Sequence, residues 1–460
     1  PANISSSEMT IDVWDYIFFT DKSYSSLKTN ISQETLDHLR NEFQYWYPVD
    51  LRSSGKDLIP NHLTFSLYNH VAIWPKKEDN RWPKAFRANG HLFLNGEKMS
   101  KSTGNFMTLI EAIERFSADG MRLTLADAGD SIEDANFDEQ NAEAQLLRLH
   151  AFIEWVKEVL DISSSQTINQ SANQESNNEN DEKKFMDYSD RVFESAINQA
   201  IKLTEEAYEN MLYKEVLKHG FFQLQNSRDN YRELCTGIEK MNMSLIKRFI
   251  EVQTLLLAPI CPHVCDYVYQ LLYPNKSIME AKWPIPGKID QSLIDSCNYL
   301  LNSVHYFRNR SKTLTAQQNK KYSEAIIHVA RDYPRWQIFV INQLKKIFKE
   351  NSSFPDNKIL SSYFKDRPEI DVKYAKKIMP FVTYCQQLVK EANNNINILD
   401  QHLSFNEYEV LLNNQEYIQR SLKLNQLQIK LIDEEDTGCI SNLDDVIPGY
   451  YTIKFDKLNY

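Results

Sequence analysis

The sequence predicts a mixed α/β region over residues 1–137, an all-helical bundle over 138–290 and an α+β region over 291–460. A chain of 460 residues exceeds the roughly 250 to 300 residues at which one hydrophobic core stops growing, so several domains are expected. Between Ala142 and Leu160 the apolar residues recur at alternating spacings of four and three, which is typical of a helix packed in a bundle. Short alternating segments nearer the C-terminus are typical of strands.

The composition is that of an ordinary globular protein, with 42% hydrophobic and 25% charged residues. A net charge of −11 argues against coating by nucleic acid, so we expect local RNA contacts and no DNA partner. The six cysteines are too scattered for a disulfide framework or a metal site, which favours a reducing compartment. Because the sequence contains neither a membrane-length apolar run nor a signal peptide, we expect a cytoplasmic protein without membrane contacts.

The first region contains the signals of a parallel sheet and a hairpin. Residues 47–51 are predicted to form a strand and residues 63–71 a helix, which together indicate a parallel-sheet unit. The dipeptide Asn95-Gly96 favours a tight hairpin turn. Thr108 and Glu111 have the spacing of a capping box, which predicts that a helix begins between them.

The second and third regions differ in their periodicity. Residues 161–184 contain almost no apolar residues and are predicted to form a disordered loop within the bundle. Helical periodicity then resumes and is interrupted at Pro259 and Pro262, and the bundle is predicted to end near residues 283–286. Beyond that point, residues 325–329 and 451–455 alternate between apolar and polar side chains and are predicted to be strands.

Lysines gather in the segment Lys98-Met99-Ser100-Lys101-Ser102-Thr103-Gly104-Asn105, which follows the predicted hairpin and precedes the capped helix. Two lysines three residues apart can converge on one polyanion, and a glycine leaves such a loop free to close over a nucleotide. Considered by themselves, two spaced lysines are more often a solvated basic loop. The complete eight-residue string is more specific than two spaced lysines and favours the nucleotide-binding loop over the solvated one.

A second group of polar residues lies in Ser53-Ser54-Gly55-Lys56-Asp57-Leu58-Ile59-Pro60-Asn61-His62. The glycine and the carboxylate follow a predicted strand, where open α/β sheets usually bind ligands. The same residues could equally form a turn that caps a helix.

The string Lys98–Ser102 resembles the signature loop of class I aminoacyl-tRNA synthetases. The stretches 14–19, 47–75, 87–105 and 117–137 are together similar to cytosolic leucyl-tRNA synthetases, and the similarity extends over nearly the whole chain. It implies that the first region is the C-terminal half of a Rossmann-type class I catalytic domain. The bundle is then of anticodon-binding type, and the α+β extension contacts tRNA.

The resemblance implies that the complete enzyme uses ATP, accompanied by Mg²⁺, to activate leucine as leucyl-adenylate and transfers it to leucine tRNA. Lys101 and Lys98 are then catalytic and stabilise the α-phosphate and the departing pyrophosphate. The residues that contact ATP are Gly55, Asp57, Lys98, Met99, Ser100, Lys101 and Ser102. His62 borders the amino-acid pocket, whereas Leu58 replaces the first of the two histidines in bacterial leucyl enzymes.

Two alternatives remain at this stage. The string Gly55-Lys56-Asp57-Leu58 is also similar to methionyl enzymes, so a methionyl, valyl or isoleucyl synthetase is the nearest rival. The other alternative is a non-catalytic protein that binds tRNA or senses leucine through protein partners. A multi-synthetase assembly is a further expected partner.

Class I enzymes carry a His-x-Gly-His motif on the first catalytic half, and none of the ten histidines lies in such a string. We therefore expect a C-terminal portion that is inactive alone.

Two further segments are interpreted as structural. Residues 261–265 contain two cysteines and a histidine around a proline, but they lack a fourth ligand at zinc spacing and indicate a buried helix start. In the segment 117–122, Asp119 is predicted to be a helix cap and Arg122 to form a structural ion pair.

Overall fold

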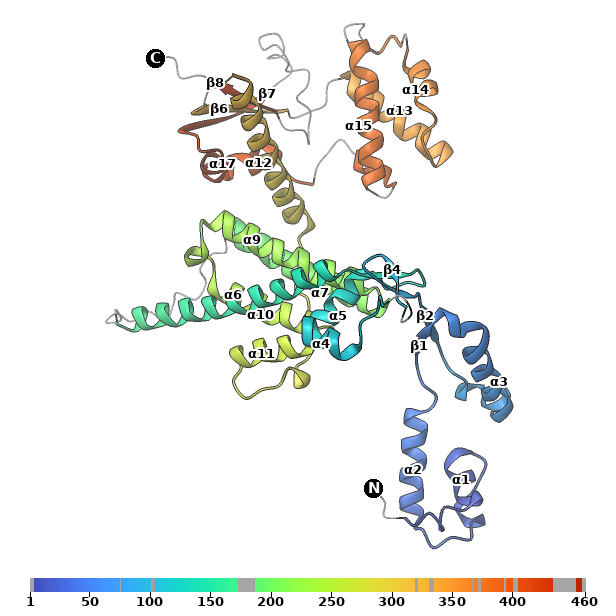
Figure 1. The fold of residues 1–460 in the computed structure, drawn as a ribbon. Helices are drawn as coiled ribbons and strands as arrows, with labels where there is room; N and C mark the ends of the chain where they lie inside the picture. Colours follow the sequence, from blue (N-terminus) through green and yellow to red (C-terminus); the bar gives the residue numbers. More distant parts are fainter. Residues whose placement is uncertain are drawn as a thin grey trace. The chain divides into compact units, whose positions relative to one another are not determined.

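The computed structural model describes residues 4–74, 76–100, 102, 104–172, 187–318, 322–330, 335–365, 367–370, 374–392, 394–399, 404–432 and 452–456. The chain forms two compact units, whose secondary structure is mostly helical (Figure 1). Unit 1 consists of Pro1–Asn173, Ile201–Gln223 and Arg248–Pro284, and unit 2 of Gln174–Ala200, Leu224–Lys247 and Ile285–Tyr460. Among the described residues, no helix is both long and apolar enough to cross a membrane.

Unit 1 begins with a helical hairpin formed by α1 (Ile11–Phe18) and α2 (Gln33–Trp46). Its small core contains Val13, Tyr16 and Leu36, all of which are buried. The local periodicity of apolar side chains is therefore sufficient to pair these two helices.

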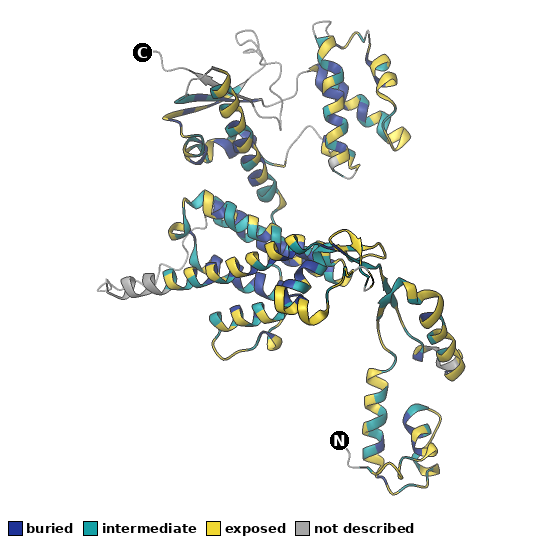
Figure 2. Cartoon of the chain, in the orientation of Figure 1, coloured by how far each residue is buried: buried dark blue, intermediate teal, exposed yellow. Residues whose placement is uncertain are grey.

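The first sheet of unit 1 pairs β1 (Arg52–Gly55) in parallel with β2 (Phe86–Asn89), and α3 (Thr64–Ile73) lies between them in sequence. The strand predicted at residues 47–51 was therefore placed too early. Pro48 has no N–H to donate to a strand ladder, and the Tyr47 hydroxyl instead accepts a hydrogen bond from the Trp74 indole at 2.8 Å. The predicted helix is confirmed, but none of its residues is buried (Figure 2).

The second sheet has the order β4-β3-β5 and is formed by β3 (Leu92–Leu94), β4 (Glu97–Lys98) and β5 (Ala135–Phe137). Strand β3 is antiparallel to β4 and parallel to β5. The φ angles of Asn95 and Gly96 are 53° and 83°, as in a tight hairpin turn, which confirms the predicted turn.

The predicted capping box is present at the start of α4 (Leu109–Phe116). The Thr108 side chain accepts a hydrogen bond from the Glu111 backbone N–H, and the Glu111 carboxylate accepts one from the Thr108 N–H. Helix α5 (Ala118–Ala128) follows after the single residue Ser117.

The predicted bundle begins with α6 (Glu139–Ala172), so the disordered loop predicted for 161–184 is wrong over residues 161–172. Propagation of an existing helix adds one hydrogen bond for each residue that is fixed, so polar residues can prolong it without forming a core. Residues 173–184 of that prediction lie outside the described residues. The remaining helices are α7 (Tyr188–Glu209), α8 (Tyr213–Leu217), α9 (Leu224–Cys235), α10 (Met243–Leu257) and α11 (Pro262–Leu272).

Unit 2 contains a sheet of order β7-β6-β8 beside α12 (Gln291–Gln318). Strand β6 (Glu324–Ala330) pairs in parallel with β7 (Gln426–Ile432) and antiparallel with β8 (Thr452–Asp456). The strands predicted at residues 325–329 and 451–455 are confirmed, whereas β7 was not predicted. The sheet core also includes residues of α16 (Glu407–Asn413) and α17 (Gln415–Leu422).

A separate helical core in unit 2 is formed by α13 (Arg335–Asn351), α14 (Asn357–Phe364) and α15 (Ala375–Glu391). Trp336 and Phe364 are buried in it. These helices therefore have their own hydrophobic interior.

Gly90, which joins β2 to β3, lies against the backbone before β5. A Cβ at this position would lie 2.0 Å from the Glu133 carbonyl oxygen. We predict that Gly90→Ala lowers the free energy of unfolding by about 2 kcal/mol or more, because backbone atoms would have to move. Urea unfolding would measure the loss, with Gly96→Asn as the control, since asparagine tolerates positive φ and this site is open. Equal midpoints for Gly90→Ala and the unsubstituted chain would contradict the prediction.

Candidate functional site

The loop after β4 is closed at its base by Asn105. The Ser100 N–H donates to the Asn105 carbonyl oxygen at 2.9 Å. The Asn105 side-chain amide lies 3.4 Å from the carbonyl oxygens of Glu97 and Lys98. Asn105, at the far end of the loop, is therefore joined to β4, at which the loop begins.

Within the loop, the two described hydroxyls contact each other, with Ser100 Oγ 2.8 Å from Ser102 Oγ. Gly104 has a φ of +75°, a backbone conformation that favours glycine. Lys101 and Thr103 lie outside the described residues. The described part is thus a short polar turn on a closed base.

Met99 and Lys98 differ in their surroundings. Met99 packs against a cluster formed by Leu94, Phe116, Phe137 and Ala142, which we call the hairpin cluster. The Lys98 side chain is exposed. Met99 therefore anchors the loop to the protein, while Lys98 is available to a ligand.

Gly55 and Asp57 lie at the carboxyl end of β1, as predicted. A Cβ on Gly55 would lie 2.5 Å from Asp57 Oδ1, so the Asp57 carboxylate folds back over the glycine. Because Asp57 is itself exposed, a larger residue at position 55 would displace this carboxylate without disrupting a core.

Lys56, which lies between Gly55 and Asp57 in sequence, forms an ion pair with Asp134. Its Nζ lies 2.7 Å from Asp134 Oδ1, and the same oxygen accepts a hydrogen bond from the His91 N–H at 2.7 Å. The hydrogen bond from Lys56 lowers the pKa of Asp134 below its ordinary value. The hydrogen bond from the His91 N–H contributes a smaller part of the same shift. This ion pair joins the segment after β1 to the start of β5. Asp134 was not predicted from the sequence, in which it is one acidic residue directly before β5.

His62 lies in a turn of π-helix, Ile59–Leu63, and its side chain is exposed. The Arg52 guanidinium, on β1, contacts His62 Nε2 and also donates to Ser66 Oγ at 3.3 Å. Since a guanidinium only donates, Nε2 is the acceptor in this contact. Turns of π-helix are frequent at functional sites.

The predicted site residues thus form two groups within unit 1. One is the loop with Lys98, Met99, Ser100 and Ser102, and the other is the segment with Gly55, Asp57 and His62. The Lys56–Asp134 ion pair connects the second group to the sheet that carries the first. A cationic loop, together with an exposed carboxylate and an exposed histidine in the same unit, can hold a polyanion and a polar substrate.

Three families match parts of the chain. Residues 19–147 match class I (M) tRNA synthetases, and residues 190–331 match the anticodon-binding domain of tRNA ligase. Residues 329–423 match a domain described as the RagD-binding domain of leucine–tRNA ligase.

The chain is also similar to complete proteins. The cytoplasmic leucine–tRNA ligase of Pongo abelii is 47% identical over 446 residues, which cover 95% of this chain and 36% of that protein. The corresponding protein of Dictyostelium discoideum is 39% identical over 469 residues, covering 99% of this chain and 41% of its own length. A solved ternary complex of an Agrobacterium radiobacter LeuRS with tRNA and LeuAMS has 16% identity and a TM-score of 0.43, covering 62% of this chain and 31% of that one. The chain therefore spans less than half the length of these relatives.

The lowered pKa of Asp134 predicts a pH-dependent contribution to stability. In Asp134→Asn the charge is lost, so we expect this variant to be less stable than the unsubstituted chain near neutral pH. A lowered folded-state pKa stabilises the fold above the ordinary value of 3.8, and this contribution is lost as the pH falls through the folded value. Urea midpoints at about pH 6 and pH 3 should therefore differ between the two proteins at the higher pH and converge at the lower one.

Asp50→Asn is the comparison variant, because hydrogen bonding to Lys84 at 2.7 Å also lowers the pKa of Asp50, but both side chains are largely exposed (Lys84 59%, Asp50 86%). Exposed ion pairs contribute little to stability, so this variant should change the midpoint little at either pH. A difference for Asp134→Asn that is the same at both pH values would contradict the prediction.

Proposed function

The chain is homologous to part of the cytoplasmic leucine–tRNA ligases, and we propose that it serves, within the complete enzyme, in the ATP-dependent activation of leucine and its transfer to leucine tRNA. The observation that carries this proposal is the loop Lys98–Asn105, with its closed base and anchored Met99, in a chain that aligns over 95% of its length with a leucine–tRNA ligase. The proposal includes a cytoplasmic location, which the names of the relatives support.

The proposed role of the loop is electrostatic. When the leucine carboxylate attacks the α-phosphate of ATP, negative charge moves towards the departing pyrophosphate. Lys101, assisted by Lys98, follows that charge, because a lysine is a compact cation on a flexible stem. Mg²⁺ accompanies ATP and neutralises phosphate charge. The Asn105 contacts hold the base of the loop against β4.

The proposed role of the segment after β1 is to hold the ribose of ATP and the leucine. Gly55 allows close approach, and the Asp57 carboxylate can accept hydrogen bonds from ribose hydroxyls. His62 borders the leucine pocket, and its Nε2 contacts Arg52. Lys56 is not assigned to ATP, because Asp134 neutralises it.

The apolar faces of unit 1 support a catalytic domain completed by another segment of the enzyme. On α3, Phe65 and Tyr68 are 60% and 67% exposed, and on α4, Leu109 and Ile110 are 73% and 70% exposed. Large contiguous apolar surfaces usually lie against a partner. We assign these faces to the first half of the nucleotide-binding fold.

The proposed partners of the rest of the chain are tRNA and protein. The bundle matches an anticodon-binding family, and residues 335–399 contain 11 Lys and Arg against six Asp and Glu in an otherwise acidic chain. A local excess of cations favours a polyanion such as tRNA. The match of residues 329–423 to a RagD-binding domain supports a protein partner for the same region.

Substitution of the loop lysine tests the catalytic proposal. We predict that Lys101→Ala in the complete enzyme lowers leucine-dependent pyrophosphate exchange by about two orders of magnitude or more, roughly 3 kcal/mol of transition-state stabilisation. Leucine binding should change little, because the lysine acts on phosphate. Lys84→Ala, which removes an exposed lysine of the same unit, is the control. Unchanged exchange in Lys101→Ala would remove this residue from the mechanism.

A second test asks whether the chain needs the rest of the catalytic domain. We predict that the 460-residue polypeptide alone shows no leucine-dependent exchange and that addition of a separately expressed N-terminal segment of the same enzyme restores it. The reason is that class I enzymes hold the triphosphate between the signature loop and a His-x-Gly-His motif that this sequence does not contain. Robust exchange by the polypeptide alone would refute this division of the site.

A further inference from the structure

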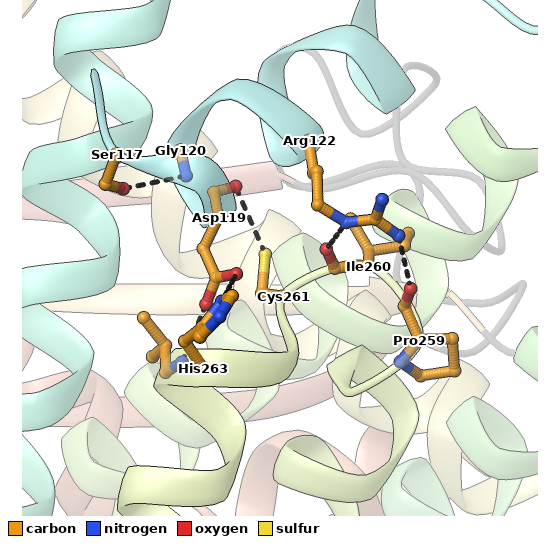
Figure 3. A network of polar contacts seen from close by, with 9 residues as sticks. Ser117, Asp119, Gly120, Arg122, Pro259, Ile260, Cys261 and His263 are labelled. Carbon is orange, nitrogen blue, oxygen red and sulfur yellow. Dashed lines mark hydrogen bonds and ion pairs between the residues drawn. The ribbon is translucent and has the colours of Figure 1, made fainter. Parts of the chain in front are cut away.

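Two side chains of α5 bind the turn that connects α10 to α11 (Figure 3). The Asp119 carboxylate accepts hydrogen bonds from the Val264 N–H at 2.6 Å and from His263 Nδ1 at 3.0 Å. The Arg122 guanidinium donates to the carbonyl oxygens of Ile260 at 2.7 Å and Pro259 at 2.9 Å. Residues more than 130 positions apart in sequence are therefore joined by four hydrogen bonds.

This arrangement confirms Asp119 as a helix cap and corrects the sequence interpretation of Arg122. Ser117 caps α5 by accepting from the Gly120 N–H at 3.1 Å, so Asp119 does not cap its own helix. Asp119 instead caps α11, whose own N-cap residue, Cys261, forms no side-chain cap. Arg122 binds backbone carbonyls rather than the expected acidic partner. The predicted buried helix start at residues 261–265 is confirmed.

The carboxylate is buried where two helices begin. Asp119 is 3% exposed and lies in the first turn of α5 while it caps the first turn of α11. Both helix dipoles favour a negative charge at this point, and charge-assisted hydrogen bonds are roughly twice as strong as neutral ones. Burial raises the pKa of the Cys261 thiol, so it stays protonated and donates to the Asp119 carbonyl oxygen at 3.6 Å.

Helix α5 is connected to the lysine loop by a short and stiff path. Only Ser117, with a φ of +60°, separates α5 from α4. Phe116, at the end of α4, belongs to the hairpin cluster against which Met99 packs. A displacement of α5 is therefore transmitted through packed side chains to the base of the loop.

The two sides of this contact belong to different family matches. Asp119 lies in the part that matches class I synthetases, whereas His263 and Val264 lie in the part that matches the anticodon-binding domain. We propose that Asp119 is a positioning residue that couples tRNA docking on the helical bundle to the placement of the loop Lys98–Asn105. This inference rests on the proposed function. Asp119 acts through α5 and α11 and does not contact a substrate.

The test uses the complete enzyme carrying Asp119→Asn, which keeps the side-chain shape and one acceptor but removes the charge. We expect the rate of tRNA leucylation to fall at least tenfold, while leucine-dependent pyrophosphate exchange without tRNA stays within about twofold of the unsubstituted enzyme. The reason is that the hairpin cluster holds the loop when tRNA is absent, whereas the contact with α11 matters when the bundle is loaded.

Two further variants separate coupling from a general loss of structure. Asp127→Asn is the matched control on the same helix, because Asp127 accepts only weak contacts from Asn141 at 3.4 Å and Gln145 at 3.3 Å. It should leave the ratio of leucylation to exchange unchanged. His263→Ala removes an imidazole that is 78% exposed, so the fold survives and the ratio should fall in the same direction as for Asp119→Asn. The double variant should then be no worse than Asp119→Asn.

Parallel loss of both activities in Asp119→Asn, or no loss of either, overturns the coupling role, as does an unchanged ratio in His263→Ala. Exchange by the unsubstituted enzyme is measured first. Absence of leucine-dependent exchange there would refute the proposed function itself, and the coupling inference with it, so the two failures are distinguishable.

Discussion

The packing of the hairpin cluster is the interaction on which the candidate site depends. Leu94 comes from β3, Phe116 from α4, Phe137 from β5 and Ala142 from α6, and each is at most 7% exposed. A strand of two residues such as β4 has almost no stability of its own. It is ordered because Met99, directly after it, reaches this cluster. Burial of a few apolar side chains thus determines where the lysine loop begins.

Polar contacts then determine the direction of each functional segment. The Asn105 amide closes the loop, Asp134 holds Lys56, and Asp119 holds α5 against α11. The two contacts that involve a carboxylate differ in burial. The Lys56–Asp134 pair is about one third exposed, whereas the Asp119 carboxylate is almost fully buried and satisfied by two donors. Removal of one partner from a buried, hydrogen-bonded charge is costly, which makes the Asp119 contact the more specific of the two.

The sequence predicted those features of the fold that depend on neighbouring residues. The turn at Asn95-Gly96 and the capping box of Thr108 and Glu111 are local, because the φ preference and the side-chain reach act within four residues. The start of β1 was missed because Arg52–Gly55 becomes a strand only by pairing with residues more than 30 positions later. Strand β7 likewise depends on β6, whose paired residues lie 102 positions earlier.

For the candidate site, the motifs indicated which residues carry the chemistry but not how they are supported. Gly55, Asp57, His62 and Lys98 were found as short strings, and their roles remain proposals. Arg52, Asp134 and His263 could not be found in this way, since each acts through a contact that only the folded chain creates. A histidine or an aspartate in isolation has many ordinary structural roles.

The distribution of apolar surface explains why such polar contacts are needed. On α3, no residue is buried and Val71 is 52% exposed. The segment from β1 to β2 therefore has little core of its own, and a two-stranded sheet is marginally stable without one. Its geometry depends on directional contacts, the Lys56–Asp134 pair and the bonds of Arg52 to His62 and Ser66. Directional contacts specify a geometry without supplying much net stability. The apolar faces of α3 and α4 would contribute that stability once they are covered, so in the proposed enzyme orientation and stability of the site come from different parts of the protein.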